Sequence, residues 1–248
     1  MSAAKEYFEY CIHAMKKTAE SQEESVKKAA EIISESCLKG GYLYIFGSGH
    51  SHMIAEEAYL RAGGLAYVRA ILPPELMLHQ MPKKSSQMER LEGYGKVLLD
   101  LYEVSKKDTL MIISNSGRNA VPVEMALEAK KRGIRVLAIS SLDHSKHSSS
   151  RHSSGKMLYE LADVVIDNGS PKGDAGFSIE GLETPIGPFS SITGIMILQG
   201  ILTEIVEILV KKDHLPPVFK SSNVDGADDY NEDLFDKYYS FYQKKGIK

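Results

Sequence analysis

Apolar residues occur along this chain in two alternating patterns: short continuous runs, and longer stretches with helical spacing. The nearly continuous runs are typical of strands that are covered on both faces of a parallel sheet. They span residues 42–46, 66–71, 109–113, 135–139 and 163–167. Helical segments such as residues 97–104 and 123–132 lie between them. We therefore predict a five-stranded parallel sheet between two layers of helices.

The two ends of the chain have helical patterns of their own. Residues 3–38 carry apolar side chains at helical spacing in two runs, and the stretch 190–212 predicts one long helix. Its most apolar part, 195–210, is interrupted by Gln199, Glu204 and Glu207, which indicates a buried amphipathic helix and not a membrane span. An acidic, aromatic tail follows at 225–242. We expect one domain over residues 1–248, with a helical lead-in (1–40), an α/β core (41–212) and a C-terminal tail (213–248).

Two short polar loops stand where a strand ends and a helix begins. They are GSGHS at residues 47–51 and SNSGRN at residues 114–119, and helices are expected at 53–62 and 122–131. A helix start leaves backbone N–H groups unpaired, glycines allow an anion to approach closely, and serines add hydroxyl donors. Because ligands bind at the carboxyl ends of parallel strands, both loops are predicted to face one phosphate group.

Two other phosphate-binding motifs fit these loops poorly. A dinucleotide fingerprint needs a third glycine where His52 stands, and an acid that is missing from residues 62–71. A nucleotide P-loop needs Gly-Lys followed by Ser or Thr, which neither loop contains. Dinucleotides and nucleoside triphosphates are therefore disfavoured.

Composition narrows the choice of partners and compartment. The net charge of the 248 residues is −3, so we expect no binding to nucleic acid or to an anionic membrane. Cys11 and Cys37 are the only cysteines, and the first ten residues are too polar for a signal peptide. We predict a cytoplasmic protein with reduced thiols.

A Ser-rich loop at residues 140–156 follows the fourth strand. It is interpreted either as a flexible loop or as a lid whose Lys146, Arg151 and Lys156 reach an anion. His144, His147 and His152 lie in it without the rigid spacing of a zinc motif, so no metal or other cofactor is expected.

With these motifs the chain resembles the SIS (sugar isomerase) domain family. The second loop is similar to the family's SxSGxT pattern, with Asn119 in the Thr position, and the resemblance extends over residues 41–210. It implies a three-layer α-β-α sandwich of flavodoxin-like type. It also implies that Ser48, Ser51, Ser114, Asn115, Ser116 and Asn119 bind the phosphate of a sugar phosphate. Within the family the chain looks most like single-domain phosphoheptose isomerases.

Two catalytic positions of those isomerases are altered here. The family carries a Glu about ten residues after the loop serine and a His on the long C-terminal helix, but this chain has Arg61 at the first position and no histidine within 190–212. Arg61 departs from the related MurNAc-6-phosphate etherases in the same way. A catalytic reading and a non-catalytic one, a sugar-phosphate sensor, both stay open.

Isomerisation needs a base and a donor near the sugar carbonyl. We take Glu56, Glu57 and Glu183 as the catalytic candidates. Glu180 is a further base, and His50, His52 and His144 are candidate donors. The predicted function is aldose-ketose isomerisation of a sugar phosphate, or a related lyase reaction, with the sensor as the alternative.

The N-terminal helix also predicts self-association. Its apolar residues include Tyr7, Phe8 and Ile12, and together with the apolar C-terminal helix they exceed what one sheet face can cover. We expect a homodimer or a homotetramer.

Overall fold

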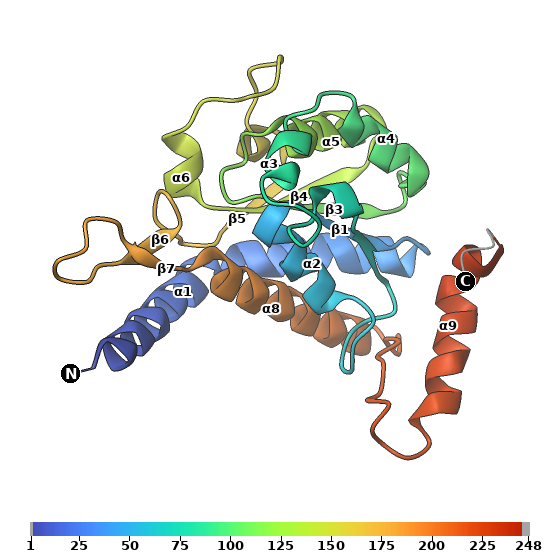
Figure 1. The fold of residues 1–248 in the computed structure, drawn as a ribbon. Coiled ribbons are helices and arrows are strands. Elements are labelled where there is room, and N and C mark those ends of the chain that lie inside the picture. The colour runs from blue at the N-terminus through green and yellow to red at the C-terminus, as the bar shows by residue number, and fades with distance from the viewer. Residues whose placement is uncertain (1, 245–248) are drawn as a thin grey trace.

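A computed structural model describes residues 2–244, and its centre is a parallel sheet with the order β2-β1-β3-β4-β5 (Figure 1). This order is the flavodoxin-like one, so the predicted fold class is confirmed. The sheet strands are β1 (Leu43–Gly47), β2 (Val68–Ile71), β3 (Thr109–Ile113), β4 (Arg135–Ser140) and β5 (Val164–Asp167). The other elements are α1 (Ala3–Leu38), η1 (Gly49–Ser51), α2 (His52–Ala58), η2 (Pro74–Leu76), α3 (Lys84–Met88), α4 (Tyr94–Leu101), α5 (Ala120–Lys131), α6 (Leu142–Lys146), α7 (Leu158–Leu161), β6 (Ala175–Phe177), β7 (Ile186–Pro188), α8 (Ser190–Lys211) and α9 (Ala227–Lys244).

Helices cover both faces of the sheet, which makes three layers (Figure 1). α1, α2 and α8 pack on one face around Ile45 and Met111, whereas α4, α5 and α7 pack on the other around Phe46 and Ile112. Successive strand residues point to opposite faces, so a strand that is buried on both sides must be apolar throughout. This is the physical reason for the continuous apolar runs.

Several helices differ in extent from the sequence expectation; α4, for example, spans Tyr94–Leu101 and not residues 97–104. The two apolar runs within 3–38 form one unbroken helix, α1. α2 ends at Ala58 and not at residue 62, because the backbone turns out of the helix at Tyr59 and Leu60 has a positive φ of 48°. The chain then pairs Gly63 and Ala66 with the segment before α9.

The Gly-rich segment after β5 forms a small antiparallel hairpin, β6–β7. Its register pairs Ala175 with Pro188 and Phe177 with Ile186. The Phe177 ring packs against Tyr7 and Tyr10 of α1. The hairpin and the N-terminal half of α1 therefore project together beyond the sheet (Figure 1).

α8 is the one helix within residues 2–244 that is long and apolar enough to cross a membrane. In the structure it packs against α1 and α2, and Ile197, Ile201 and Ile205 are buried in the core. A core helix of a globular domain passes the same test of length and composition.

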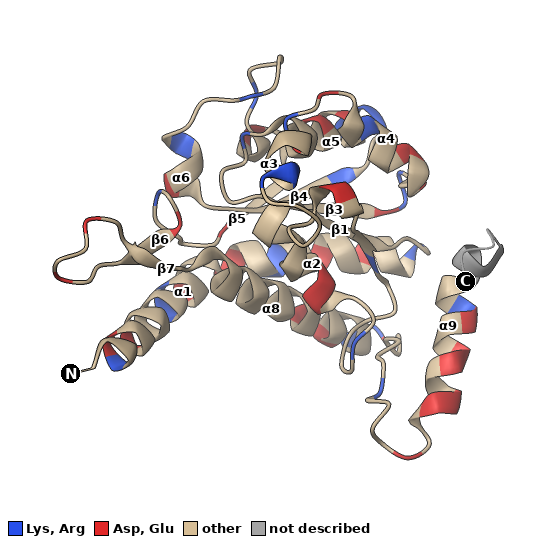
Figure 2. Cartoon of the chain, viewed as in Figure 1, with Lys and Arg blue, Asp and Glu red and all other residues tan. Residues whose placement is uncertain are grey.

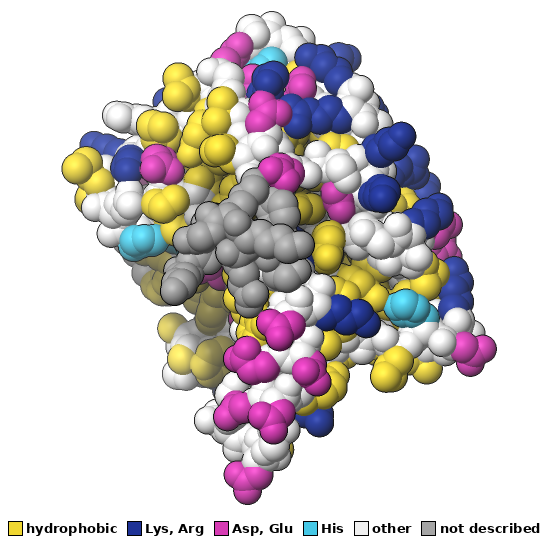
Figure 3. Space-filling model, turned by 90° about the vertical axis from the view of Figure 1, so that its right-hand side faces the viewer, with side chains coloured by type: hydrophobic (Ala, Val, Ile, Leu, Met, Phe, Trp, Pro, Cys, Tyr) yellow, Lys and Arg dark blue, Asp and Glu magenta, His cyan; other side chains and the backbone are white. Residues whose placement is uncertain are grey.

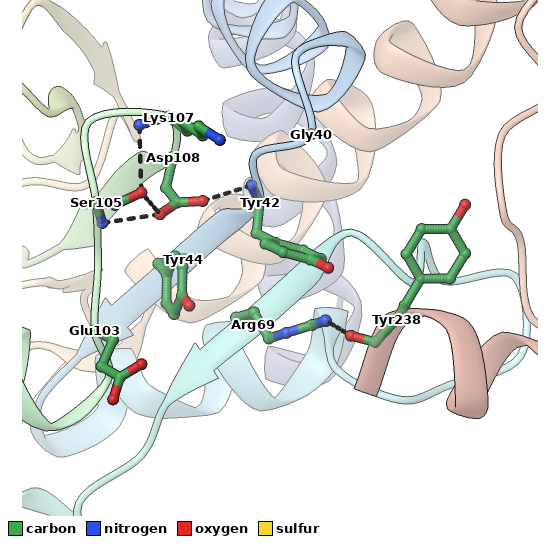
Figure 4. A pocket seen from close by; sticks show the side chains of 9 residues that line it. All are labelled: Gly40, Tyr42, Tyr44, Arg69, Glu103, Ser105, Lys107, Asp108 and Tyr238. Atoms are coloured by element: carbon green, nitrogen blue, oxygen red, sulfur yellow. Dashed lines mark hydrogen bonds between the residues drawn. The ribbon is translucent and has the colours of Figure 1, made fainter. Parts of the chain in front are cut away.

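α9 stands apart from the layers, beside the edge strand β2 (Figure 1). Its Asp and Glu residues form an acidic exposed face (Figures 2 and 3). Its inner face packs Leu234 and Tyr239 against Ala66 and Phe219. Arg69 of β2 reaches this helix at the wall of a cavity of about 290 Å³ that Tyr42, Tyr44 and Tyr238 also line (Figure 4).

Candidate functional site

The two polar loops lie side by side at the carboxyl edge of the sheet. β1 and β3 are neighbours, and their last residues, Gly47 and Ile113, are paired in register. The direction in which successive strands are added to the sheet reverses here, since β2 lies on one side of β1 and β3 on the other. Such a switch point opens a crevice outside the strand ends, and both loops border it.

Glycines give the loops their shape. Gly49 and Gly117 have φ values of +57° and +58°, in the left-handed region that favours glycine. At Gly47 a Cβ would lie within van der Waals overlap of the Ser51 carbonyl. The backbone of the first loop therefore folds tightly on itself, and Ser51 N–H donates to the Ser48 carbonyl at 3.1 Å.

Several donors of the two loops have no hydrogen-bond partner within residues 2–244. They include the side-chain hydroxyls of Ser51 and Ser116 and the backbone N–H groups of His50 and Arg118. Ser51 and Ser116 are both half-buried. Hydroxyl and N–H donors that have no partner in the protein can donate to an anion such as phosphate.

Ser48 and Asn119, by contrast, already bind a carboxylate. The Ser48 hydroxyl donates to Glu89 Oε2 at 2.8 Å, and Asn119 Nδ2 donates to Glu89 Oε1 at 2.7 Å. Val121 N–H also donates to the backbone carbonyl of Glu89, at 3.0 Å. Glu89 thus joins the first loop, the second loop and the start of α5.

The environment of Glu89 is unusual for a glutamate. Burial raises the pKa of its carboxyl, while the hydrogen bonds from Ser48 and Asn119 and the nearby Arg90 and Arg151 oppose that shift. Glu89 is in no recognised motif, so the sequence analysis missed it. One signal was available: Glu89 lies in the connection that follows β2, and that connection begins at the same sheet edge as the two loops.

Ser114 and Asn115 hold the second loop in place. The Ser114 hydroxyl accepts from Gly117 N–H at 3.2 Å and closes the turn. The Asn115 side-chain oxygen accepts from Asn168 Nδ2 at 3.0 Å and from the Ser170 hydroxyl at 2.9 Å. Both side chains therefore form hydrogen bonds within the protein, whereas the hydroxyls of Ser51 and Ser116 form none within residues 2–244.

The three predicted catalytic acids have other partners or are exposed to solvent. Glu56 is exposed on α2 and lies 3.5 Å from His52 Nε2, and Glu57 forms an ion pair with Arg61 one turn later. Glu183 is exposed in the segment that joins β6 and β7, a hairpin that extends away from α2 (Figure 1). None of the three has a hydrogen bond to a loop serine within the described residues.

The Ser-rich loop is anchored onto the second polar loop. Arg118 Nε donates to the Ser149 carbonyl at 2.8 Å, and Arg151 N–H donates to the Arg118 carbonyl at 2.7 Å. Arg151 Nη1 donates to the Asn119 side-chain oxygen at 3.0 Å. In the part of the chain that the structure describes, its histidines do not gather with acids into a set of three metal ligands.

Known proteins are similar to this chain over most of its length. Residues 6–141 match the SIS domain family. A UPF0309 protein of Halalkalibacterium halodurans is 53% identical over 237 residues, which are 96% of this chain and 98% of that protein. A UPF0309 protein of Oceanobacillus iheyensis is 44% identical over 239 residues, which are 96% of this chain and 97% of that protein.

Solved structures share the fold at low sequence identity. The phosphoheptose isomerase GmhA from Neisseria gonorrhoeae has a TM-score of 0.58 and 19% identity, covering 82% of this chain and 97% of its own. The NanR protein of Vibrio vulnificus, complexed with ManNAc-6P, has a TM-score of 0.53 and 16% identity, covering 86% of this chain and 65% of its own.

Proposed function

Since this chain belongs to the SIS domain family, we propose that it binds a phosphorylated sugar in the crevice between the loops after β1 and β3. The observation that carries the proposal is the set of unpaired donors of these two loops, above all the hydroxyls of Ser51 and Ser116. A phosphate group has several acceptor oxygens and a negative charge, so it suits such a set of donors. The sugar ring or open chain would extend from this point toward Glu89.

A thermal-shift screen tests the binding. Hexose, heptose and amino-sugar phosphates are compared with the same sugars without phosphate and with inorganic phosphate. A ligand at a hundred times its Kd adds about 2.7 kcal/mol to the free energy of unfolding. Stabilisation by phosphorylated sugars, but not by the unphosphorylated ones, is the expected result. If no sugar phosphate stabilises the protein, the proposal fails.

We further propose that the bound sugar phosphate undergoes aldose-ketose isomerisation or a related lyase reaction. The phosphoheptose isomerase of Neisseria gonorrhoeae shares the fold, and the half-buried carboxylate of Glu89 lies beside the loops of this chain. An isomerase exchanges the C1 or C2 hydrogen with solvent through an enediol, even when net conversion is small. Incubation of a stabilising sugar phosphate in heavy water should therefore introduce deuterium, which mass spectrometry detects.

A sugar-phosphate sensor is the second candidate. NanR, whose structure holds ManNAc-6P, shares the fold, and here Glu56 and Glu57 of α2 lie beside the side chains of His52 and Arg61. A ligand that stabilises the protein but acquires no deuterium and undergoes no elimination would establish this alternative. In either case we propose a cytoplasmic location.

A further inference from the structure

We propose that Glu89 is the proton-transferring carboxylate of this site. The inference rests on the proposed isomerisation, and it names a residue outside the family motifs of the two loops. Its basis is geometric: the Glu89 carboxylate lies against the first loop through Ser48 and against the second through Asn119, at 2.8 and 2.7 Å. Glu89 therefore stands at the crevice where the donors for phosphate converge.

The contacts hold the carboxylate in one position. Each oxygen accepts one hydrogen bond from a different loop, and the backbone of Glu89 is fixed by Val121 N–H. Asn119 is oriented in turn, because Arg151 donates to its Oδ1 and so leaves Nδ2 to face Glu89. A base whose own partners fix its orientation loses little entropy when it reacts.

Asn119 also explains a departure from the family pattern. A Thr hydroxyl would have to serve both partners through a single oxygen. The Asn119 amide instead donates to Glu89 from Nδ2 and accepts from Arg151 on Oδ1, two separate atoms. Asn119, which stands where the family has Thr, is thus hydrogen-bonded to Glu89, which comes from the connection after β2.

The electrostatics suit a base that works near neutral pH. Burial raises the pKa of Glu89, which makes its carboxylate a stronger base than a fully solvated one. Charged groups that face it are Arg90 and Arg151, which favour the ionised form. Glu56, on α2, is half-exposed beside His52 and lacks this environment.

The step is a proton shuttle. Glu89 takes the proton from C2 of the aldose, the C2–H electron pair forms the C1–C2 double bond, and the C1 carbonyl pair moves to O1. The hydroxyl proton on O2 transfers to O1, and Glu89 returns its proton to C1 as the O2 carbonyl forms. The isomerisation therefore needs no oxidant, reductant or cofactor.

The test compares Glu89→Gln with Glu75→Gln. Gln keeps the size of the side chain and can bond both Ser48 and Asn119, but it accepts no proton at neutral pH. Glu75 lies in the same connection after β2, and its carboxylate accepts from the Tyr94 hydroxyl at 3.2 Å outside the loops. Binding of a stabilising sugar phosphate is measured by calorimetry, and deuterium incorporation by mass spectrometry.

We expect Glu89→Gln to slow exchange about 10³-fold while the Kd changes less than fivefold, and Glu75→Gln to change neither. Exchange in Glu89→Gln at the wild-type rate would overturn the inference, as would loss of exchange in Glu56→Gln or Glu57→Gln alone. If wild-type protein binds sugar phosphates without exchange, the proposed isomerisation fails first, which is a separate result.

If Glu89→Gln does not fold, Glu89→Asp takes its place. Asp keeps the carboxylate but shortens the side chain by one methylene, so exchange should fall at least tenfold with binding retained. Exchange at the wild-type rate in that variant would also overturn the inference.

Discussion

Ser51 and Ser116 differ from Ser48 and Asn119 in what their side chains bind. The first two are half-buried hydroxyls without a partner in the described residues, and the other two donate to Glu89. A phosphate that used Ser48 or Asn119 would first have to displace a carboxylate, whereas Ser51 and Ser116 are free to donate. At the scale of single residues, this divides the predicted phosphate ligands into two groups.

Replacing both Ser51 and Ser116 with Ala should weaken sugar-phosphate binding by about 3 kcal/mol, roughly a hundredfold in Kd, because two hydrogen bonds to a charged group are lost. The free energy of unfolding should stay within about 0.5 kcal/mol. Calorimetry measures the first and urea unfolding the second. Ser222→Ala, in the exposed segment before α9, is the matched control. Unchanged binding in the double variant would place the phosphate elsewhere.

Glu89 should also set part of the pH dependence of stability. Its pKa is raised in the folded protein, so the native state binds this proton more tightly than the unfolded state does. Its contribution therefore favours folding at low pH and is lost as the pH rises through the raised pKa. Glu89→Gln removes this loss, so the variant should gain stability relative to wild type as the pH rises above the ordinary pKa of a glutamate. Urea unfolding at several pH values measures the difference; a constant difference would contradict the shifted pKa.

At the scale of elements, the start of α5 has fewer unpaired N–H donors for an anion than the start of a helix usually has. The Val121 N–H is bound by the Glu89 carbonyl, and Pro122, the next residue, has no N–H. Asn119, the N-cap residue, points its amide at Glu89 and does not cap the helix. The donors for phosphate therefore come mainly from the loops, with little from the helix end that the sequence pattern suggested.

A second element, α9, depends on one buried cation. Arg69 is only 4% exposed, and its guanidinium lies 4.1 Å from the Tyr42 ring centroid and 3.8 Å from that of Tyr239. It donates to the carbonyls of Ala66 and Val68, both at 3.0 Å, and to the Tyr238 carbonyl of α9 (Figure 4). No ion pair within residues 2–244 includes Arg69, so carbonyls and rings alone stabilise its charge.

Arg69→Met should cost about 3 kcal/mol of folding free energy, because three carbonyls lose a donor and two cation–π contacts disappear. Proteolysis within residues 220–226, just before α9, should become faster than in wild type. Urea unfolding and limited proteolysis measure these effects. Arg135→Met is the control, since the Arg135 side chain is 57% exposed at the start of β4. Equal stability of the two variants would show that Arg69 does not hold α9.

At the scale of the whole molecule, one apolar surface is left uncovered. Phe8 and Ile12 of α1 are 61% and 62% exposed, and the adjacent hairpin exposes Leu182 and Ile186. Where the hairpin meets the start of α1 there is an apolar groove of about 330 Å³, lined by Tyr7, Phe177 and Ile179 among others. A contiguous apolar surface of this kind is typical of an interface, and we propose a second copy of the chain as its partner.

Light scattering at micromolar concentration should therefore give the mass of a dimer or a tetramer. The double variant Phe8→Glu/Ile12→Glu should shift the assembly toward smaller species, because charges replace apolar contacts at the interface. Leu215→Glu, at a residue that is 89% exposed in the segment before α9, should leave the mass unchanged. A monomeric wild type would contradict the proposal.

The sequence by itself determined the fold class and the position of the two loops. Continuous apolar runs require strands that are covered on both faces, and the residues after β1 and β3 must then meet at one edge of a parallel sheet. β3 begins and ends where the pattern predicted it, and the other sheet strands shift by one or two residues at their ends. The fold class could be read from local sequence, because every residue of a strand that is covered on both faces must be apolar.

Only the tertiary structure decided which side chains of the loops are free and which acid stands beside them. Glu89 is 41 residues from Ser48 and 30 from Asn119, and no local pattern relates residues at such separations. Whether Glu56 faces a ligand or His52 likewise depends on packing around α2, which the periodicity of one helix does not specify. Connections from several strands begin at the same sheet edge, so the sequence identifies the edge. Which of their residues come into contact there depends on how the whole chain folds.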